Sequence, residues 1–273
     1  MSTDFAHLPF TVIGPRLRQS PFFAATRKYG CKAYSVYNHM YMPLFYEDPV
    51  SEYWNLLNHV CLWDVACERQ VEISGPDAFK LSQYLTCRDV SKCEVGQCMY
   101  APLLDERGNI LNDPIMLRVE ENKFWFSLAD SDILLWVKGI ALGNNYDVIV
   151  NEPFVSPLAV QGPKAEDLMT DLLGKWVREL KFFRCQQTTL NSIPFILARS
   201  GWSKQGGFEL YLQDSRYGEE LWNSIMLAGK PYNIAPGAPS NIERIESGLL
   251  SFGSDMDFTN NPFEVGLDKI YQP

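Results

Sequence analysis

The sequence lacks the motifs that mark the most common kinds of catalytic and metal site. The seven cysteines form no Cys-x-x-Cys pair and their spacing fits no zinc motif, while three histidines are too few and too dispersed for an obvious metal centre. The serine-nucleophile pattern G-x-S-x-G and the phosphate-loop pattern G-x-x-x-x-G-K are also absent. These absences predict no metal and favour chemistry by positioning of substrates, or no chemistry.

Long apolar runs and an excess of basic residues are missing as well. No stretch reaches the ~18 apolar residues that a membrane span requires, and the N-terminal M-S-T-D-F-A-H carries no signal-peptide pattern. A net charge of −9 argues against nucleic-acid binding, which requires clustered Lys and Arg. An odd number of scattered cysteines is typical of free thiols in a reducing compartment. The sequence therefore predicts a cytoplasmic protein with neither nucleic acid nor membrane as a partner.

The pattern of apolar residues predicts an α+β fold. The 273 residues are 46% apolar and 21% charged, which leaves room for one large globular domain or two ordinary ones. Strand and helix signals alternate through short, hairpin-like connections, and no low-complexity linker separates two halves. Helices are expected at residues 21–29, 49–59, 75–85, 130–139, 217–227 and 242–250. Strands are expected at residues 32–37, 70–74, 99–104, 110–119, 124–128, 148–150, 158–160, 194–198 and 208–212.

The most informative segment is R-S-G-W-S-K-Q-G-G-F-E at residues 199–209, between two expected strands. Its three glycines allow a sharp bend and a close approach of the backbone to a neighbour. Trp202 and Glu209 bracket the bend, and an aromatic face with a carboxylate suits a flat heterocycle that carries N–H donors. The alternative is an ordinary hairpin with an exposed Trp and a solvated Glu.

Four segments occur in a fixed order along the chain: V-Y-N-H-M-Y-M-P, M-Y-A-P-L-L-D-E-R-G-N-I-L-N-D-P-I, L-A-V-Q-G-P-K, and the bend together with E-R-I-E-S-G-L-L-S-F-G-S-D-M. From about residue 34 to 269, their order and spacing resemble the glycine-cleavage T-protein family of tetrahydrofolate-dependent (amino)methyltransferases. The resemblance implies a cloverleaf of interleaved sheet-plus-helix domains, with a C-terminal β-barrel domain absent from this chain. The two expected domains are residues 1–48 plus 145–238 and residues 49–144 plus 239–273.

The resemblance also implies a tetrahydrofolate site. Glu209 falls on the Glu that holds the pterin edge, and Trp202 replaces the family's pterin-packing Tyr in G-Y-T-G-E-x-G-F-E. Tyr100 takes the place of another folate-contacting Tyr, and Arg244 falls on the Arg of R-L-E-A-G. Tetrahydrofolate is therefore the predicted methyl acceptor.

Two departures from the T-protein pattern point to another methyl donor. Asn112-Asp113 stands where T-proteins have Asp-Asp, and Asn cannot act as a carboxylate base for aminomethyl transfer. S-K-Q replaces T-G-E, which exchanges a negative charge for a positive one. Within the family, V-Y-N-H-M, C-E-R-Q-V-E, I-L-N-D-P, A-D-S-D and S-K-Q-G-G are most similar to the demethylases of dimethylsulfoniopropionate (DMSP).

A sulfonium donor fits these residues chemically. Its leaving group is a neutral thioether, so transfer to N5 of tetrahydrofolate depends on alignment, which contributes roughly 7–11 kcal/mol. The products are 5-methyltetrahydrofolate and 3-(methylthio)propanoate. Asn112 and Tyr37 are the predicted catalytic positions, and Tyr37 shares with Tyr100 and Trp202 the aromatic faces that attract a cation. His39 and Lys204 are the predicted partners of the DMSP carboxylate.

Several alternatives remain open at this point. The donor could instead be a methoxylated aromatic acid, a methylated amine or a glycine-derived aminomethyl group. A non-catalytic folate-binding relative is a second class, although its K-G-C-Y-x-G-Q signature is absent. His39 could be a structural histidine, Lys204 a solvated turn residue, and Asn112 a residue that closes a turn before Pro114. A homo-oligomer is also left open.

Overall fold

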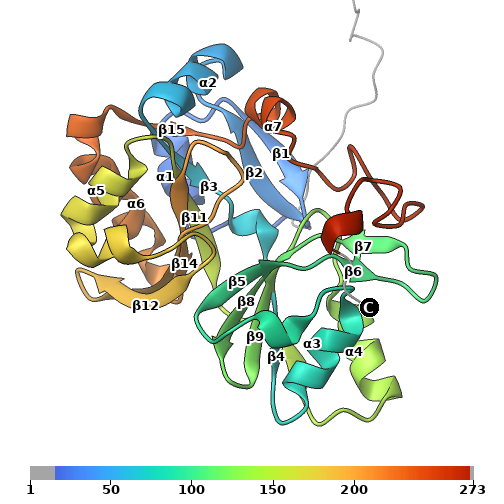
Figure 1. The fold of residues 1–273 in the computed structure, drawn as a ribbon. Helices are drawn as coiled ribbons and strands as arrows, with labels where there is room; N and C mark the ends of the chain where they lie inside the picture. Colours follow the sequence, from blue (N-terminus) through green and yellow to red (C-terminus); the bar gives the residue numbers. More distant parts are fainter. Residues whose placement is uncertain (1–15, 271–273) are drawn as a thin grey trace, which may run out of the picture.

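The computed structural model describes residues 16–270, and two β-sheets form its framework (Figure 1). In the six-stranded sheet every neighbouring pair is antiparallel except β3 with β15. Its strands, in spatial order, are β12 (Cys185–Leu190), β13 (Ile193–Ala198), β14 (Gly207–Leu212), β11 (Ser156–Gln161), β3 (Val60–Asp64) and β15 (Ile234–Gly237).

Different helices cover the two faces of the six-stranded sheet. On one face, α1 (Phe23–Lys28), α5 (Ala165–Leu173) and α6 (Gly218–Ala228) pack over the largest apolar core, which includes Trp222 and Leu168. Successive residues of a strand point to opposite faces, so Leu62 enters this core while Trp63 packs against α2 (Pro49–Asn58) on the other face.

The five-stranded sheet is entirely antiparallel, and one of its faces is covered by α3 (Ala78–Leu85) and α4 (Leu134–Gly143). Its opposite face meets the six-stranded sheet, where Cys98, Leu117 and Trp125 pack against Ile196 and Tyr211. Its strands, in spatial order, are β10 (Ile149–Asn151), β4 (Gln70–Ser74), β9 (Lys123–Ser127), β8 (Ile115–Glu120) and β5 (Gln97–Tyr100). The two sheets are therefore joined by an apolar contact between their inner faces.

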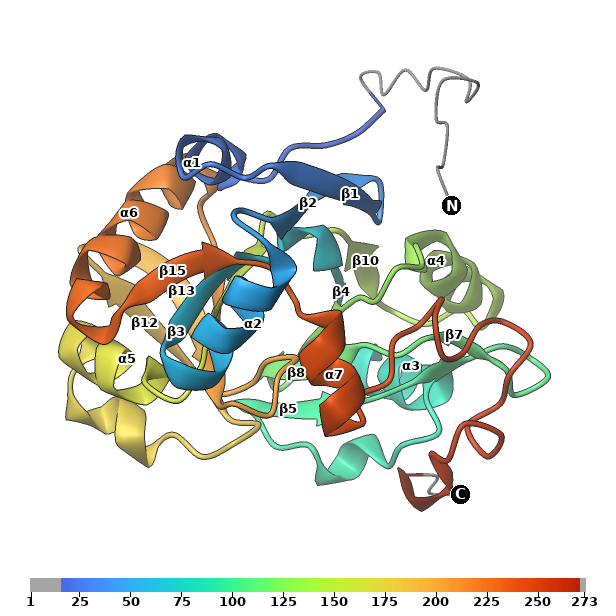
Figure 2. The same cartoon turned by 90° about the horizontal axis from the view of Figure 1, so that it is seen from above.

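Smaller elements surround this contact. β1 (Ala33–Tyr37) and β2 (Met40–Phe45) form a separate hairpin, and β6 (Leu103–Leu104) pairs with β7 (Ile110–Asn112). Figure 2 shows α7 (Asn241–Ser247) in a central position between the two sheet regions. The short 3₁₀ segments are η2 (Ala66–Glu68), η3 (Val90–Lys92), η4 (Lys175–Glu179), η5 (Ser215–Tyr217), η6 (Lys230–Tyr232) and η7 (Asp268–Ile270).

Several predicted elements differ from those in the structure. The expected strands at 99–104 and 110–119 are each divided in two, since Pro102 and Pro114 cannot donate to a ladder. The helix expected at 130–139 begins at Leu134, because residues before it bind other elements. The helix expected at 242–250 ends at Ser247, where Gly248 adopts a φ of +67°. The elements β2, β3, β12, β15 and α5 are not among those predicted.

Sheet membership places two strands differently from the predicted domain boundaries. β3 lies in the six-stranded sheet, although the prediction assigns residues 49–144 to the second domain. β10 lies in the five-stranded sheet, although the prediction assigns residues 145–238 to the first. The chain crosses between sheets before Gln70 and again after Asn151, and the division into two domains otherwise stays a prediction.

The described part of the chain has three further properties that bear on function. All seven cysteines are free thiols, as predicted. Within residues 16–270, no helix combines the length and apolarity needed to cross a bilayer. Over the same residues, no group of three or more His, Cys, Asp or Glu side chains is arranged to hold a metal ion.

Candidate functional site

The bend at residues 199–209 forms the connection between β13 and β14, and it closes tightly on β11. Ser203 Oγ donates to Gln161 Oε1 at 2.8 Å, and Gln161 Nε2 donates to the Ser200 carbonyl at 3.1 Å. A Cβ at Gly201 would lie 2.0 Å from Gln161 Nε2, so this position requires glycine. The glycines therefore serve a close approach within the protein, and this approach fixes where β14 begins.

β14 presents Glu209 to the space between the two sheets. Phe208, Leu210 and Leu212 face the helical core, so Glu209 and Tyr211 point the other way, towards the five-stranded sheet. Ser200 Oγ donates to Glu209 Oε2 at 2.5 Å, and Tyr211 Oη donates to the same oxygen at 3.2 Å. The second oxygen, Oε1, accepts no hydrogen bond from the residues that the structure describes.

A second carboxyl group, Glu68, lies close to Glu209. Glu68 ends η2 and is held by Ser127, whose Oγ donates to its Oε2 at 2.7 Å. Burial raises the pKa of Glu209, although its hydrogen bonds act in the opposite direction. Burial, followed by the charge of Glu209, raises the pKa of Glu68 well above its usual range. Two carboxyl groups whose charges interact so strongly resist being ionised together, and a ligand with N–H donors or positive charge relieves that cost.

Asp113 and two tyrosines complete the arrangement. Tyr100 Oη donates to Asp113 Oδ2 at 3.1 Å, and burial is the main cause that raises the pKa of Asp113 to about 7. Burial also raises the pKa of Tyr37, and the charges of Glu68 and Asp113 act on it in the same direction, which places Tyr37 near both. We call this set the central polar cluster: Tyr37, Glu68, Tyr100, Asp113, Ser127, Ser200, Glu209 and Tyr211.

Trp202 and Arg244 form a second group beside α7. The Arg244 guanidinium lies 5.8 Å from the centroid of the Trp202 ring, and the indole Nε1 donates to the Leu250 carbonyl at 3.2 Å. Arg244 Nη1 binds Asp255 Oδ2 at 2.5 Å. The charge of Asp255 also contributes to the raised pKa of Asp113, so this group adjoins the central polar cluster. Contacts thus join Trp202 with Arg244 and Tyr100 with Asp113, and charge interactions link these pairs to Tyr37 and, through Glu68, to Glu209.

The other predicted site residues are placed differently. Exposed His39 occupies the β1–β2 turn with a φ of +59°, and no bond of its imidazole is formed with other described residues. Lys204 is exposed and its Nζ binds the Ser247 carbonyl at the end of α7, so its charge faces the helix C-terminus. Neither contacts the central polar cluster in the described structure, and their roles towards the substrate carboxylate stay predictions.

Asn112 is completely buried and all its hydrogen-bonding groups are used within the protein. Its Nδ2 donates to the carbonyls of Ala129 and Ser131 at 3.0 and 2.9 Å, and its Oδ1 accepts from Ala129 N at 3.0 Å. These bonds attach β7 to the segment before α4. This geometry is that of a structural residue, the catalytic role of Asn112 stays a prediction, and the neighbouring Asp113 is the residue that contacts Tyr100.

We expect Asn112→Ala to destabilise the fold, because a fully buried side chain loses three hydrogen bonds to the backbone of Ala129 and Ser131. The free energy of unfolding should fall by about 2–4 kcal/mol. Equilibrium denaturation in urea measures this change, with the exposed Asn223→Ala as a control. Unchanged stability together with lost activity would instead support the catalytic role predicted from the sequence.

Sequence reasoning missed Glu68 and Asp113 as members of the site. Both lie within motifs, Glu68 in C-E-R-Q-V-E and Asp113 in I-L-N-D-P. The sequence signal that could have identified them was a carboxyl residue in a short connection between two strands. The identity of its neighbours depends on contacts between distant segments.

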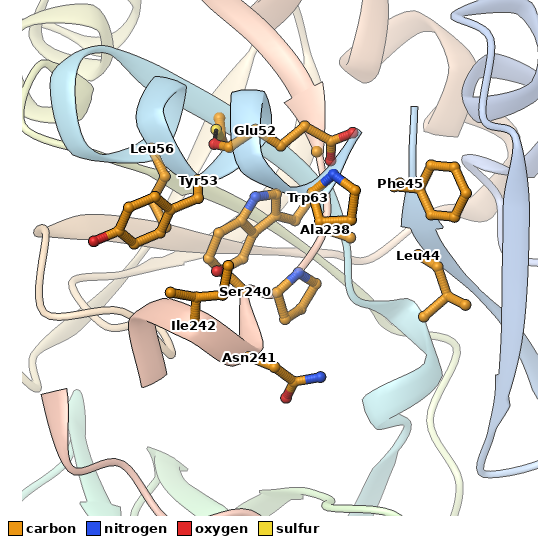
Figure 3. A pocket seen from close by; sticks show the side chains of 14 residues that line it. Leu44, Phe45, Glu52, Tyr53, Leu56, Trp63, Ala238, Ser240, Asn241 and Ile242 are labelled. Carbon is orange, nitrogen blue, oxygen red and sulfur yellow. Dashed lines mark hydrogen bonds between the residues drawn. The ribbon is translucent and has the colours of Figure 1, made fainter. Parts of the chain in front are cut away.

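A separate cavity of about 250 Å³ lies between α2 and the link from β15 to α7 (Figure 3). Trp63, Tyr53 and Glu52 line it on one side, and Ser240 and Ile242 line it on the other. None of the predicted site residues is among its lining residues. The acceptors and aromatic groups that suit a folate lie in the central polar cluster, so the cavity is not the candidate site.

Comparison with known proteins bears on both the fold and the chemistry. The GCVT N-terminal domain family matches residues 22–272. The dimethylsulfoniopropionate demethylase DmdA of Ruegeria pomeroyi is 47% identical over 255 residues, which are 93% of this chain and 70% of that protein. An aminomethyltransferase of Porphyromonas gingivalis is 31% identical over 241 residues, which are 84% of this chain and 64% of that protein.

A solved structure gives the same result for the fold. The glycine cleavage system aminomethyltransferase T from Bartonella henselae superposes with a TM-score of 0.83 at 25% identity, covering 94% of this chain and 70% of that one. The α+β, T-protein-like fold predicted from the sequence is therefore confirmed.

Proposed function

Because this chain belongs to the GCVT N-terminal domain family, we propose that it is a tetrahydrofolate-dependent methyltransferase whose methyl donor is DMSP. The observation that carries the choice of donor is the similarity to the R. pomeroyi demethylase. Free thiols throughout the chain support a cytoplasmic location as part of the proposal.

The central polar cluster suits the reduced pterin of tetrahydrofolate. The pterin carries adjacent N–H donors, and Glu209 Oε1 has no donor among the described residues. We assign the pterin edge to Glu209, with Tyr100 and Trp202 as neighbouring aromatic surfaces. Tyr211 and Ser200 already fix Glu209 Oε2, so the carboxylate is preorganised for the ligand.

In the proposed reaction, the lone pair of N5 attacks a methyl carbon of the sulfonium. The electron pair of the broken C–S bond stays on sulfur, which leaves as the neutral thioether of 3-(methylthio)propanoate. N5 must also lose its proton to give 5-methyltetrahydrofolate. Asp113 is the proposed acceptor, since a carboxyl group with a pKa of about 7 exchanges protons efficiently near neutral pH.

The structure does not favour an aminomethyl donor. The position that T-proteins fill with the first Asp is occupied by Asn112, and its amide is engaged in three bonds within the protein. Tyr37 supports a cationic donor instead, because this half-buried aromatic residue lies within the range of the Glu68 charge and its hydroxyl has no partner in the described chain.

A donor comparison tests this function. The protein is incubated with tetrahydrofolate and one donor at a time: DMSP, glycine betaine, a methoxylated benzoate, or an aminomethylated lipoyl protein. We expect 5-methyltetrahydrofolate, detected by mass spectrometry, only with DMSP. Transfer from a different donor alone would replace DMSP as the substrate, and no methylated folate with any donor would contradict the function.

A further inference from the structure

Glu68 has a fixed position that the roles assigned so far do not use. It lies on η2, where the chain passes from β3 in one sheet to β4 in the other. Its carbonyl accepts from Leu128 N at 2.9 Å, and its Oε2 accepts from Ser127 Oγ at 2.7 Å. Gln70 Nε2 donates in turn to Ser127 Oγ at 3.0 Å. The backbone and the side chain of Glu68 are therefore both held by residues at the end of β9.

Acceptors outnumber donors around Glu68. Its Oε1 accepts no hydrogen bond from the described residues. Two nearby buried oxygens, Gln70 Oε1 and Asn38 Oδ1, also have no donor in the described chain. Asn38 adjoins η2, because its Nδ2 donates to the Cys67 carbonyl at 3.2 Å. Unpaired buried acceptors cost free energy unless a ligand or solvent supplies donors or positive charge.

No cation of the described chain neutralises this group. The next residue, Arg69, forms ion pairs with Glu152 and Asp132, at 2.6 and 3.2 Å. The charged neighbour that acts most on Glu68 is the carboxyl group of Glu209. Burial and the charge of Glu209 both raise the pKa of Glu68, whereas a cation bound at its open Oε1 would lower that pKa and favour the carboxylate form. Tyr37 lies within the range of the Glu68 charge, and the residues beside the two are joined by the bond from Asn38 Nδ2 to the Cys67 carbonyl.

We propose that Glu68 recognises the positive charge of the methyl donor, placing the sulfonium between its carboxylate and the Tyr37 ring. This inference rests on the proposed function, because it names the group that reads the donor's charge. A carboxylate and an aromatic face attract a sulfonium whose hydration is lost. A neutral molecule of the same shape gains neither attraction, so Glu68 makes the site selective for cationic donors.

Binding measurements with two ligands that differ only in the charge at one end test the proposal. DMSP and its neutral isostere 4-methylpentanoate have similar shapes and the same carboxylate. We expect the unmodified protein, with folic acid as a folate that accepts no methyl group, to bind DMSP more tightly than the isostere in calorimetry. In Glu68→Gln, which can still accept from Ser127, DMSP binding should weaken by about tenfold, while the isostere and tetrahydrofolate bind as before.

Two controls separate recognition from folding. Glu220→Gln removes an exposed carboxylate on α6 and should leave every affinity unchanged. Glu68→Asp keeps the charge and should retain part of the preference for DMSP. Thermal unfolding should show that all three variants remain folded.

The outcomes distinguish this inference from the proposed function. Loss of the DMSP preference in Glu68→Gln supports the inference, even if no methyl group reaches the folate and the proposed function fails alone. An unchanged preference in Glu68→Gln overturns the inference, even if methyl transfer from DMSP is observed. Equal weakening of DMSP and isostere binding overturns it too, since charge would then play no part.

Discussion

Asp113→Asn lowers the rate of methyl transfer by about 10²- to 10⁴-fold, the contribution typical of a positioned acid or base. The introduced amide oxygen would still accept from Tyr100, whose bond to Asp113 Oδ2 measures 3.1 Å, so the local geometry should persist. The amide cannot take the N5 proton. A rapid-quench single-turnover experiment with saturating DMSP and tetrahydrofolate measures the loss at the chemical step. Binding of both ligands should change little.

The pH dependence identifies the group responsible. Burial raises the pKa of Asp113 to about 7, while the hydrogen bond from Tyr100 acts in the opposite direction. The base is active when ionised, so the rate should rise with pH through about 7 and level off above it. This step should vanish in Asp113→Asn. An identical profile in both proteins would assign proton removal to another group.

The pH dependence of the folding stability gives an independent test of the raised pKa of Asp113. The pKa of Asp113 is higher in the folded protein than the ordinary value of 3.8, so folding binds a proton between those limits. The stability linked to that proton is present below about pH 4 and is lost as pH rises through about 7. Asp113→Asn should therefore gain stability relative to the unmodified protein as the pH rises from about 4 to about 7, measured by thermal unfolding. The opposite trend would contradict a raised pKa.

Glu209→Gln weakens tetrahydrofolate binding by about 10- to 100-fold. A hydrogen bond to a charged group contributes roughly 1.5–3 kcal/mol, and an amide would also turn its own N–H₂ towards the donors of the pterin. Ser200 and Tyr211 would still donate to the remaining oxygen, so the strand should hold its place. Quenching of tryptophan fluorescence on titration with tetrahydrofolate provides the dissociation constant.

A matched control makes this result specific. Glu220 is an exposed carboxylate on α6, and Glu220→Gln should bind tetrahydrofolate like the unmodified protein. Affinity for DMSP should be affected less than affinity for the folate in Glu209→Gln. If Glu209→Gln bound tetrahydrofolate normally, the pterin edge could not lie on this residue.

Two local rules act on the segment that holds Glu209, and they concern the direction of its side chain, while its role towards the pterin stays a prediction. Alternation along β14 separates Glu209 and Tyr211 from the apolar residues that face the helices. The glycines at the bend predicted that the backbone there would approach a neighbour closely, and Gly201 indeed packs against the side chain of Gln161. Both rules act over a few residues, so they can be read without knowledge of the rest of the fold.

Other features depend on contacts between distant segments, which no local pattern reveals. The partners of Asn112 come from the segment before α4, and Glu68 senses the charge of Glu209 because η2 and β14 approach where the two sheets meet. β3 was missed because all five of its residues are buried, which removes the alternation of a half-exposed strand. Lys204 was predicted to bind the substrate because it lies in the bend. In the structure its Nζ binds the Ser247 carbonyl at the end of α7, a contact between segments far apart in the sequence.

A crystal structure of the protein with bound tetrahydrofolate tests the central claim most directly. The account predicts the pterin amine edge within about 3 Å of Glu209 Oε1, with N5 directed towards Asp113 and the space beside Tyr37 and Glu68. A pterin bound instead in the cavity beside Trp63, or with Glu209 out of contact, would contradict it.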